Sequence, residues 1–180
     1  MEIKDSGERR IFETGAVRDA AEGRGRCDLL PLDCVGDFFG FLARPEWCKQ
    51  ADACYTILKC LNDVVRGTDE KAIAKCINRF VEVAFEDKPG HALMELSKHY
   101  EEGAKKYAER NWQKGISCHC YIDSCVRHLL KWYDGWDDEP HDRAVLWNLF
   151  GLWWTLRNKP EMNDLPWDKD GENNDRDSES

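Results

Sequence analysis

The stretch "EPHDRAVLWNLFGLWWTL", residues 139–156, carries apolar side chains on nearly every side of a helix. A helix that is apolar all round is normally buried, so we expect this one at the centre of the core. Asn148 interrupts its apolar surface. A buried amide without partners costs about 1–3 kcal/mol. Asn148 therefore either bonds to a neighbouring helix or faces a pocket.

The segments before it show the same helical spacing. Apolar side chains recur at i, i+3, i+4 and i+7 in residues 45–67 and again in residues 70–85, and Gly67 suits the end of the first helix. Further helices are predicted at about 91–108 and 119–134. We find no alternating strand-like run and no internal repeat, so the predicted fold class is all-α.

Composition divides the chain into three parts. Residues 1–28 are rich in charge and glycine and predict an extended N-terminal arm laid over the domain. Residues 29–158 form the helical domain, and the acidic residues 159–180 predict a disordered tail. Residues 160–180 hold eight acidic and two basic side chains, a net charge of −6 out of −9 for the chain. No basic footprint for nucleic acid is present, so we expect no nucleic-acid partner.

The sequence also predicts a cytoplasmic protein without a membrane partner. The first ten residues are charged and lack an apolar signal region. The longest apolar stretch is too short to span a bilayer and contains Asn148. Nine cysteines, an odd number, are better explained as reduced thiols than as a disulfide framework.

Candidate functional residues begin in "HYEEGAKKYAERNWQKG", residues 99–115. On a helix, Glu95, His99, Glu102 and Lys106 share one face. This face is either solvated and held by ion pairs along the helix, or it lines a ligand site.

Two later helices add polar groups among apolar ones. His128 lies in "VRHLL", and Asp138, His141 and Asn148 fall on one face of the last helix, with Asp142 beside it. A bundle that brings carboxylate, imidazole and amide groups to one cavity can hold Mg²⁺. Arginines of the arm, near glycines, can bind phosphate through charged hydrogen bonds, and Trp112 can stack on a base. The arginines are Arg18, Arg24 and Arg26.

Four blocks of this sequence resemble one family in wording and order. They are "ETGAVRDAAEGRGRCDLLPL", "YEEGAKKYAERNWQKG", "VRHLLKW" and "HDRAVLWNLF". Together they resemble the phage and prophage dATP/dGTP diphosphohydrolase (N-terminal domain) family, which is related to the MazG-like nucleotide pyrophosphohydrolases. The resemblance covers about residues 13–32 and 99–148. Relative to shorter members, residues 45–90 look like a helical insertion.

The resemblance implies a MazG-like helical bundle, a homo-oligomer, and a purine nucleotide as ligand in a bacterial or phage-infected cell. It implies metal-dependent hydrolysis of purine (deoxy)nucleoside triphosphates to monophosphate and pyrophosphate, with Mg²⁺ or Mn²⁺ as cofactor. The catalytic candidates are Glu102 and His128. The metal candidates are Glu101, Glu102, Asp138, His141 and Asp142. The substrate-binding candidates are Arg18, Arg24, Arg26, Lys105, Lys106, Asn111, Trp112, Lys114, Arg127 and Asn148.

The sequence departs from the MazG pattern at its metal motif. Lys105 stands where a third glutamate is expected, and the following helix lacks the Glu-x-x-Asp pair. One alternative is a different metal site, built from Glu102, His128, Asp138 and His141. A second is a non-catalytic nucleotide-binding protein, such as a phage sponge for a nucleotide immune signal. A third is a helical protein-interaction domain.

A zinc site is a further alternative in "CHCYIDSCVRH", residues 118–128. Cys118, Cys120, Cys125 and His128 are suitable ligand types, but their spacing is not one of the common zinc patterns. The resemblance rests on Arg127 and His128 rather than on these thiols.

Overall fold

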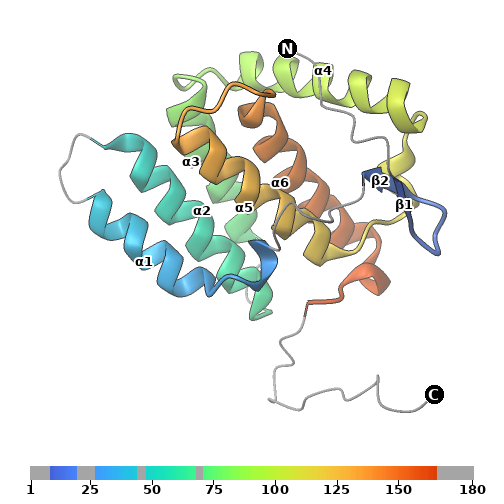
Figure 1. Cartoon of the computed structure of the whole chain (residues 1–180), viewed down its shortest axis with the longest axis horizontal. Helices are drawn as coiled ribbons and strands as arrows, with labels where there is room; N and C mark the ends of the chain where they lie inside the picture. Colours follow the sequence, from blue (N-terminus) through green and yellow to red (C-terminus); the bar gives the residue numbers. More distant parts are fainter. Residues whose placement is uncertain (1–8, 20–26, 44–47, 68–70, 166–180) are drawn as a thin grey trace.

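The computed structural model describes residues 9–19, 27–43, 48–67 and 71–165 (Figure 1). Within these ranges it contains six α-helices, one small two-stranded sheet and three 3-10 helices, which confirms the all-α prediction. The elements are β1 (Arg9–Ile11), β2 (Val17–Asp19), η1 (Cys27–Leu29), α1 (Leu32–Leu42), α2 (Lys49–Val65), α3 (Lys71–Ala84), α4 (Pro89–Tyr107), η2 (Asn111–Lys114), α5 (Cys118–Tyr133), α6 (His141–Asn158) and η3 (Pro160–Met162).

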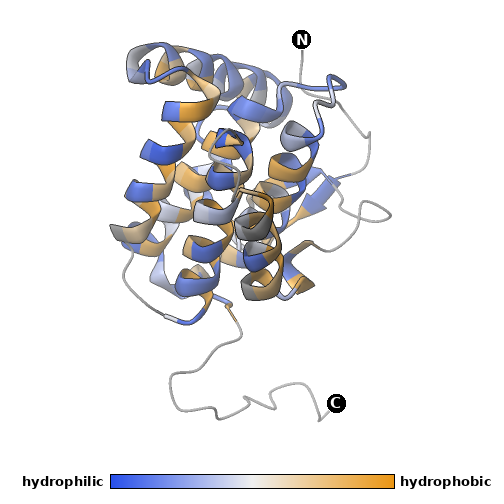
Figure 2. Ribbon diagram, turned by 90° about the vertical axis from the view of Figure 1, so that its left-hand side faces the viewer, coloured by the Kyte–Doolittle hydropathy of each residue, from blue (hydrophilic) through white to orange (hydrophobic). Residues whose placement is uncertain are grey.

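Helix α6 is central, as its sequence predicts. Ten of its residues are buried, and Leu146, Leu149 and Leu152 are almost completely enclosed. The α5 helix lies beside it, because only residues 134–140 connect the two helices (Figure 1). Along several of the helices, hydrophobic and hydrophilic segments follow one another, as the 3.6-residue period of an amphipathic helix requires (Figure 2).

Helices α2 and α3 pack on each other and on the central pair, α2 mainly against α5 and α3 mainly against α6. Ile57, Leu58 and Leu61 of α2 are completely buried, and Gly67, with a φ of +73°, follows the end of this helix. Phe80 of α3 packs edge-on against Trp132 of α5, with ring centroids 4.9 Å apart. The predicted insertion, residues 45–90, is thus part of the hydrophobic core where the structure describes it.

The N-terminal arm contains a β-hairpin. The sequence predicts only an extended arm, and the three-residue strands are too short for a visible alternation. The strands pair antiparallel, with Arg10 opposite Arg18. Asn111 fastens the hairpin, since its side-chain amide accepts from the backbone N–H of Val17 and donates to the Val17 carbonyl, at 2.9 and 2.7 Å. Asp19 accepts hydrogen bonds from Lys106 and Tyr107 of α4, each at 2.7 Å.

The segment after α6 turns back onto α5. Following η3, Asp164 accepts a hydrogen bond from the backbone N–H of His119 at 3.0 Å and pairs with the His119 ring. The predicted tail begins at residue 159, and its part from residue 166 onward lies outside the described residues. No helix of the described ranges has the length and apolar content needed to cross a bilayer.

The pairing of His119 with Asp164 predicts a pH dependence of stability. This hydrogen bond, with a smaller contribution from Cys120, raises the pKa of His119 from 6.5 to about 10. A raised pKa in the folded state means that the stabilisation is complete below about pH 6.5 and is lost as pH rises through about 10. We expect the free energy of unfolding of the wild type to fall across this range relative to that of His119→Gln.

Urea unfolding at pH 6, 8 and 10 measures this difference. His91→Gln is the matched control, because His91 is an exposed histidine of α4. An identical pH profile for wild type and His119→Gln would contradict the assignment.

Candidate active site

A cavity of about 700 Å³ lies between the hairpin, α4, η2, α5 and α6. This volume falls within the usual range for small-molecule sites, about 300–1,000 Å³. None of the residues that line it belongs to α1, α2 or α3. Its polar lining includes Arg10, Arg18, Asp19, His99, Asp123, Arg127, His128, Lys131, Asp138, Glu139 and Asn148.

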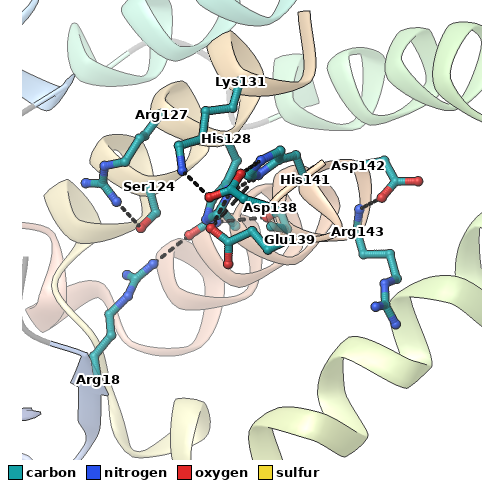
Figure 3. A network of polar contacts seen from close by, with 12 residues as sticks. Arg18, Ser124, Arg127, His128, Lys131, Asp138, Glu139, His141, Asp142 and Arg143 are labelled. Atoms are coloured by element: carbon teal, nitrogen blue, oxygen red, sulfur yellow. Dashed lines mark hydrogen bonds and ion pairs between the residues drawn. The ribbon is translucent and has the colours of Figure 1, made fainter. Parts of the chain in front are cut away.

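Arg18 enters the cavity from β2. One terminal nitrogen, Nη2, donates to Oδ1 of Asn148 at 2.8 Å (Figure 3). The guanidinium also lies 5.5 Å from the ring centre of Tyr121 and 5.3 Å from that of Trp147. The other nitrogen, Nη1, is buried and has no hydrogen-bond partner among the described residues. Because a buried N–H without a partner is costly, Arg18 is held ready for an acceptor in the cavity.

Asn148 has the partners that a buried amide needs. Its Nδ2 donates to the carbonyl of Ala144 at 2.8 Å, and its Oδ1 accepts from Arg18. These hydrogen bonds run to its own helix and to the hairpin rather than to a neighbouring helix, and Asn148 lines the cavity, so the alternative of a polar group facing a pocket is the one realised.

Arg127 and Lys131, one turn apart on α5, add positive charge to the cavity wall. Arg127 pairs with Asp123, and its Nη1 lies 3.5 Å from the Ser124 hydroxyl. Lys131 donates to Asp138 at 3.1 Å. The Nε of Arg127 is buried without a hydrogen-bond partner in the described part of the chain. Arg127 and Lys131 thus line the same cavity as Arg18, which is the one predicted arm arginine within the described residues.

Two imidazoles and two carboxylates meet at one end of the cavity (Figure 3). Nδ1 of His128 lies 3.0 Å from Nδ1 of His141. Nε2 of His141 bonds to Oδ1 of Asp138 at 2.7 Å, and Oε1 of Glu139 lies 3.7 Å from His128. Burial, reinforced by the neighbouring His141, lowers the pKa of His128 well below 6.5, so this imidazole is neutral at pH 7. Neutral imidazole can act as a metal ligand.

Aromatic rings also line the cavity. Rings of Tyr100 and Trp112 lie 5.5 Å apart, and those of His99 and Trp147 lie 5.9 Å apart. Burial lowers the pKa of His99 to about 3, and its Nδ1 has no hydrogen-bond partner among the described residues. A neutral imidazole among flat apolar rings suits an uncharged heterocycle, which can stack and accept or donate a hydrogen bond.

Other predicted residues of α4 point elsewhere. Lys105 pairs with Glu101 at 2.6 Å, and both side chains are largely exposed. Glu101 lies on the rim of the cavity, whereas Lys105 does not line it. Oε1 of Glu102 contacts Arg143 at 3.3 Å, and Glu102 is absent from the cavity wall. Lys106 holds Asp19 of the hairpin, so it acts on the cavity through β2.

Of the other predicted site residues, some line the cavity and others lie outside it. Trp112 lines the cavity, as does Asn111, but both polar atoms of the Asn111 amide are used on Val17. Lys114 reaches the Gly15 carbonyl at 3.4 Å, outside the cavity. Asp142 accepts from the backbone N–H of Arg143 and points away from the imidazoles (Figure 3).

Arg24 and Arg26 lie outside the described residues. Across the described ranges, the only three-residue group suited to a metal ion is His128, Glu139 and His141, so the zinc arrangement of Cys118, Cys120 and Cys125 does not form there.

Sequence reasoning missed Glu139, Lys131 and Trp147 as site residues. Glu139 follows Asp138 directly in "DDEPH", just before a predicted helix that already contains His141. Glu139 could have been identified from its position beside Asp138 and His141, which were already metal candidates. Trp147 stands next to Asn148, but a tryptophan in an apolar helix is indistinguishable from ordinary core packing.

Comparison with known proteins supports the resemblance. A family model described as dATP/dGTP diphosphohydrolase, N-terminal, matches residues 69–165. This range holds α3 to α6 and the imidazole–carboxylate end of the cavity; it begins within the predicted insertion and leaves out the hairpin. Searches of curated proteins and of solved structures found no match. Since the family model covers more than half of the 180 residues, the chain belongs to the dATP/dGTP diphosphohydrolase N-terminal-domain family.

Proposed function

We propose that this chain hydrolyses purine deoxynucleoside triphosphates to the monophosphate and pyrophosphate, with a divalent cation as cofactor. The observation that carries the proposal is the mixed lining of one cavity, which combines cationic side chains, an imidazole–carboxylate cluster and aromatic rings. A nucleotide combines the matching chemical groups, a charged triphosphate and a flat base. The family match makes dATP and dGTP the first substrates to test.

The triphosphate belongs beside Arg18, Arg127 and Lys131. Arginine forms paired hydrogen bonds with phosphate oxygens, and the unpartnered Nη1 of Arg18 can donate one of them. Hydrolysis of a phosphoanhydride depends mainly on positioning and on stabilising charge that spreads over the phosphate oxygens. Fixed cations in a partly enclosed cavity provide this stabilisation.

The purine belongs beside Trp112, Trp147 and His99. Offset or edge-on aromatic contacts favour a flat base in this wall. The free Nδ1 of His99 can bond to an edge of the base or to the sugar.

The cofactor belongs at the imidazole–carboxylate end, where the donor set of His128, Glu139 and His141 fits a divalent ion. When bound, such an ion neutralises phosphate charge and lowers the pKa of a coordinated water. Asp138, the second carboxylate of the cluster, accepts a hydrogen bond from Nε2 of His141 and so orients this imidazole. Glu102 is off the cavity wall and pairs with Arg143, so we assign it no step of the reaction.

A turnover assay in ¹⁸O-labelled water tests the proposal. Purified protein is mixed with dGTP, dATP, dCTP or dTTP and with Mg²⁺ or Mn²⁺, and the products are separated by chromatography. We expect dGMP or dAMP with ¹⁸O in the monophosphate, because water attacks the α-phosphorus, and much slower turnover of the pyrimidine nucleotides.

Release of nucleoside and triphosphate would show that the bond between the α-phosphorus and the 5′ oxygen breaks instead of the α–β phosphoanhydride bond. This result would contradict the proposed reaction. Tight binding of a nucleotide without any product would support the alternative of a non-catalytic nucleotide-binding protein. Heat-inactivated protein is the control for background hydrolysis.

A further inference from the structure

We infer that His128, Glu139 and His141 form a binding site for one first-row transition-metal ion, such as Mn²⁺, Fe²⁺, Co²⁺ or Zn²⁺, in preference to Mg²⁺. The role of this ion in turnover rests on the proposed function, whereas its binding is tested without substrate. The site differs from the glutamate-rich set that the resemblance implies, because it uses no carboxylate of α4.

The first support is the spacing of the ligand atoms. Ligands bound at about 2.0–2.2 Å to one ion lie roughly 3 Å from one another. The two Nδ1 atoms of His128 and His141 are 3.0 Å apart. Oε1 of Glu139 lies 3.7 Å from the first and 4.0 Å from the second, within about 1 Å of the expected separation.

The second support is the orientation of His141. Its Nε2 bonds to Asp138 at 2.7 Å, and a carboxylate there accepts the Nε2–H. An imidazole that donates from Nε2 can present the lone pair of Nδ1, and this Nδ1 lies 3.0 Å from Nδ1 of His128 and 4.0 Å from Oε1 of Glu139. Metal-binding histidines usually have such a carboxylate partner on the other ring nitrogen. Asp138 therefore acts as a positioning residue, and Lys131 in turn holds Asp138 at 3.1 Å.

The ligand chemistry decides between classes of metal. Mg²⁺ prefers oxygen ligands in an octahedral arrangement and seldom binds imidazole. Two imidazole nitrogens with one carboxylate favour Mn²⁺, Fe²⁺, Co²⁺ or Zn²⁺. His141 is buried, whereas His128 and Glu139 line the cavity. The remaining coordination positions of the ion thus face the cavity, where water or a phosphate oxygen can occupy them.

Metal titration of the whole chain tests the inference. Protein treated with a chelator and dialysed is titrated with Mn²⁺ or Mg²⁺ by calorimetry, and bound Mn²⁺ is examined by pulsed EPR for coupling to imidazole ¹⁴N. We expect one Mn²⁺ per chain, with ¹⁴N coupling, and binding at least tenfold tighter than that of Mg²⁺.

Variants locate the site. Glu139→Gln and His128→Asn are expected to weaken Mn²⁺ binding by at least tenfold and Asp138→Asn by about 10- to 100-fold. The matched controls Asp137→Asn, in the same loop, and His91→Asn, on α4, should bind Mn²⁺ as the wild type does. Glu139→Gln is nearly isosteric, and circular dichroism of each metal-free variant confirms that it is folded.

Mn²⁺ bound without ¹⁴N coupling, or bound equally well by Glu139→Gln, would overturn the inference, as would the absence of Mn²⁺ binding. In that case the two imidazoles only bond to each other. The turnover assay separates this result from the proposed function. Metal bound at the cluster without hydrolysis refutes the activity alone, and hydrolysis with metal binding unaffected by these variants refutes the metal site alone.

Discussion

Arg18→Lys is expected to lower kcat/KM for dGTP by roughly 10- to 100-fold, which corresponds to the loss of a charge-assisted hydrogen bond. Lysine keeps the positive charge but cannot donate to Asn148 and to a phosphate oxygen with one planar group. It also loses the stacked position between Tyr121 and Trp147. Steady-state kinetics with dGTP measure the loss in kcat/KM. Calorimetry with a non-hydrolysable dGTP analogue measures the loss in binding.

Arg9→Lys is the matched control for this substitution. Arg9 lies on the other strand of the same hairpin, pairs with Asp19 at 3.0 Å and does not line the cavity. We expect its kinetics to remain within about twofold of the wild type. Thermal unfolding of both variants shows whether the hairpin still packs on α4. Equal kcat/KM for Arg18→Lys and the wild type would remove Arg18 from the phosphate site.

Gly151→Ala is expected to lower the free energy of unfolding by about 1–3 kcal/mol or more, although alanine is the better helix former. A methyl group at position 151 of α6 would lie within 3.0 Å of three ring carbons of Tyr121. The Tyr121 ring is completely buried, so it cannot move toward solvent. The added methyl group must therefore displace α5 from α6 or force Tyr121 out of its rotamer.

Gly103→Ala in α4 provides the comparison. An added methyl group there meets no atom within 4 Å, so we expect a gain of about 0.5–1 kcal/mol in the free energy of unfolding from reduced backbone entropy. Urea unfolding at pH 7 measures both variants. A stabilised Gly151→Ala variant would show that α5 and α6 are less closely packed than the structure indicates.

The same contact links stability to the cavity. Tyr121 supports Arg18 on one side and packs against Trp147, with ring centroids 5.6 Å apart. Displacing Tyr121 therefore disturbs Arg18 and Trp147 together, the residues that we propose to bind the triphosphate and the base. Gly151→Ala should weaken binding of the dGTP analogue as well as lower stability.

The helices were predictable from local sequence. Apolar periodicity located α2 through α6 to within a few residues, and the nearly uniform apolar surface of residues 139–156 placed α6 in the core. The positions of the helices and the burial of α6 depend on which side chains avoid water. In a helix such apolar side chains recur every three or four residues, so they are visible in the sequence. The hairpin was not predictable in this way, because its strands are short and its register depends on Asn111 and Asp19 holding it against α4 and η2.

Residue types for the site were likewise visible in the sequence, but their grouping was not. His128, Asp138 and His141 were identified from polar groups within apolar surroundings, and they do come together. Glu102 and Lys105 have the same chemical character, yet one pairs with Arg143 and the other with Glu101, both away from the imidazoles.

The sequence by itself therefore determined the fold class, the central helix and the family, since these depend on local periodicity and ordered motifs. Only the tertiary structure decided that Glu139 joins His128 and His141, and that Arg18 crosses from the arm to Asn148, 130 positions away. Contacts of this kind depend on the angle and separation at which α5 and α6 pack and on how the hairpin is fastened. These quantities are set by the whole core and leave no periodic pattern in the chain.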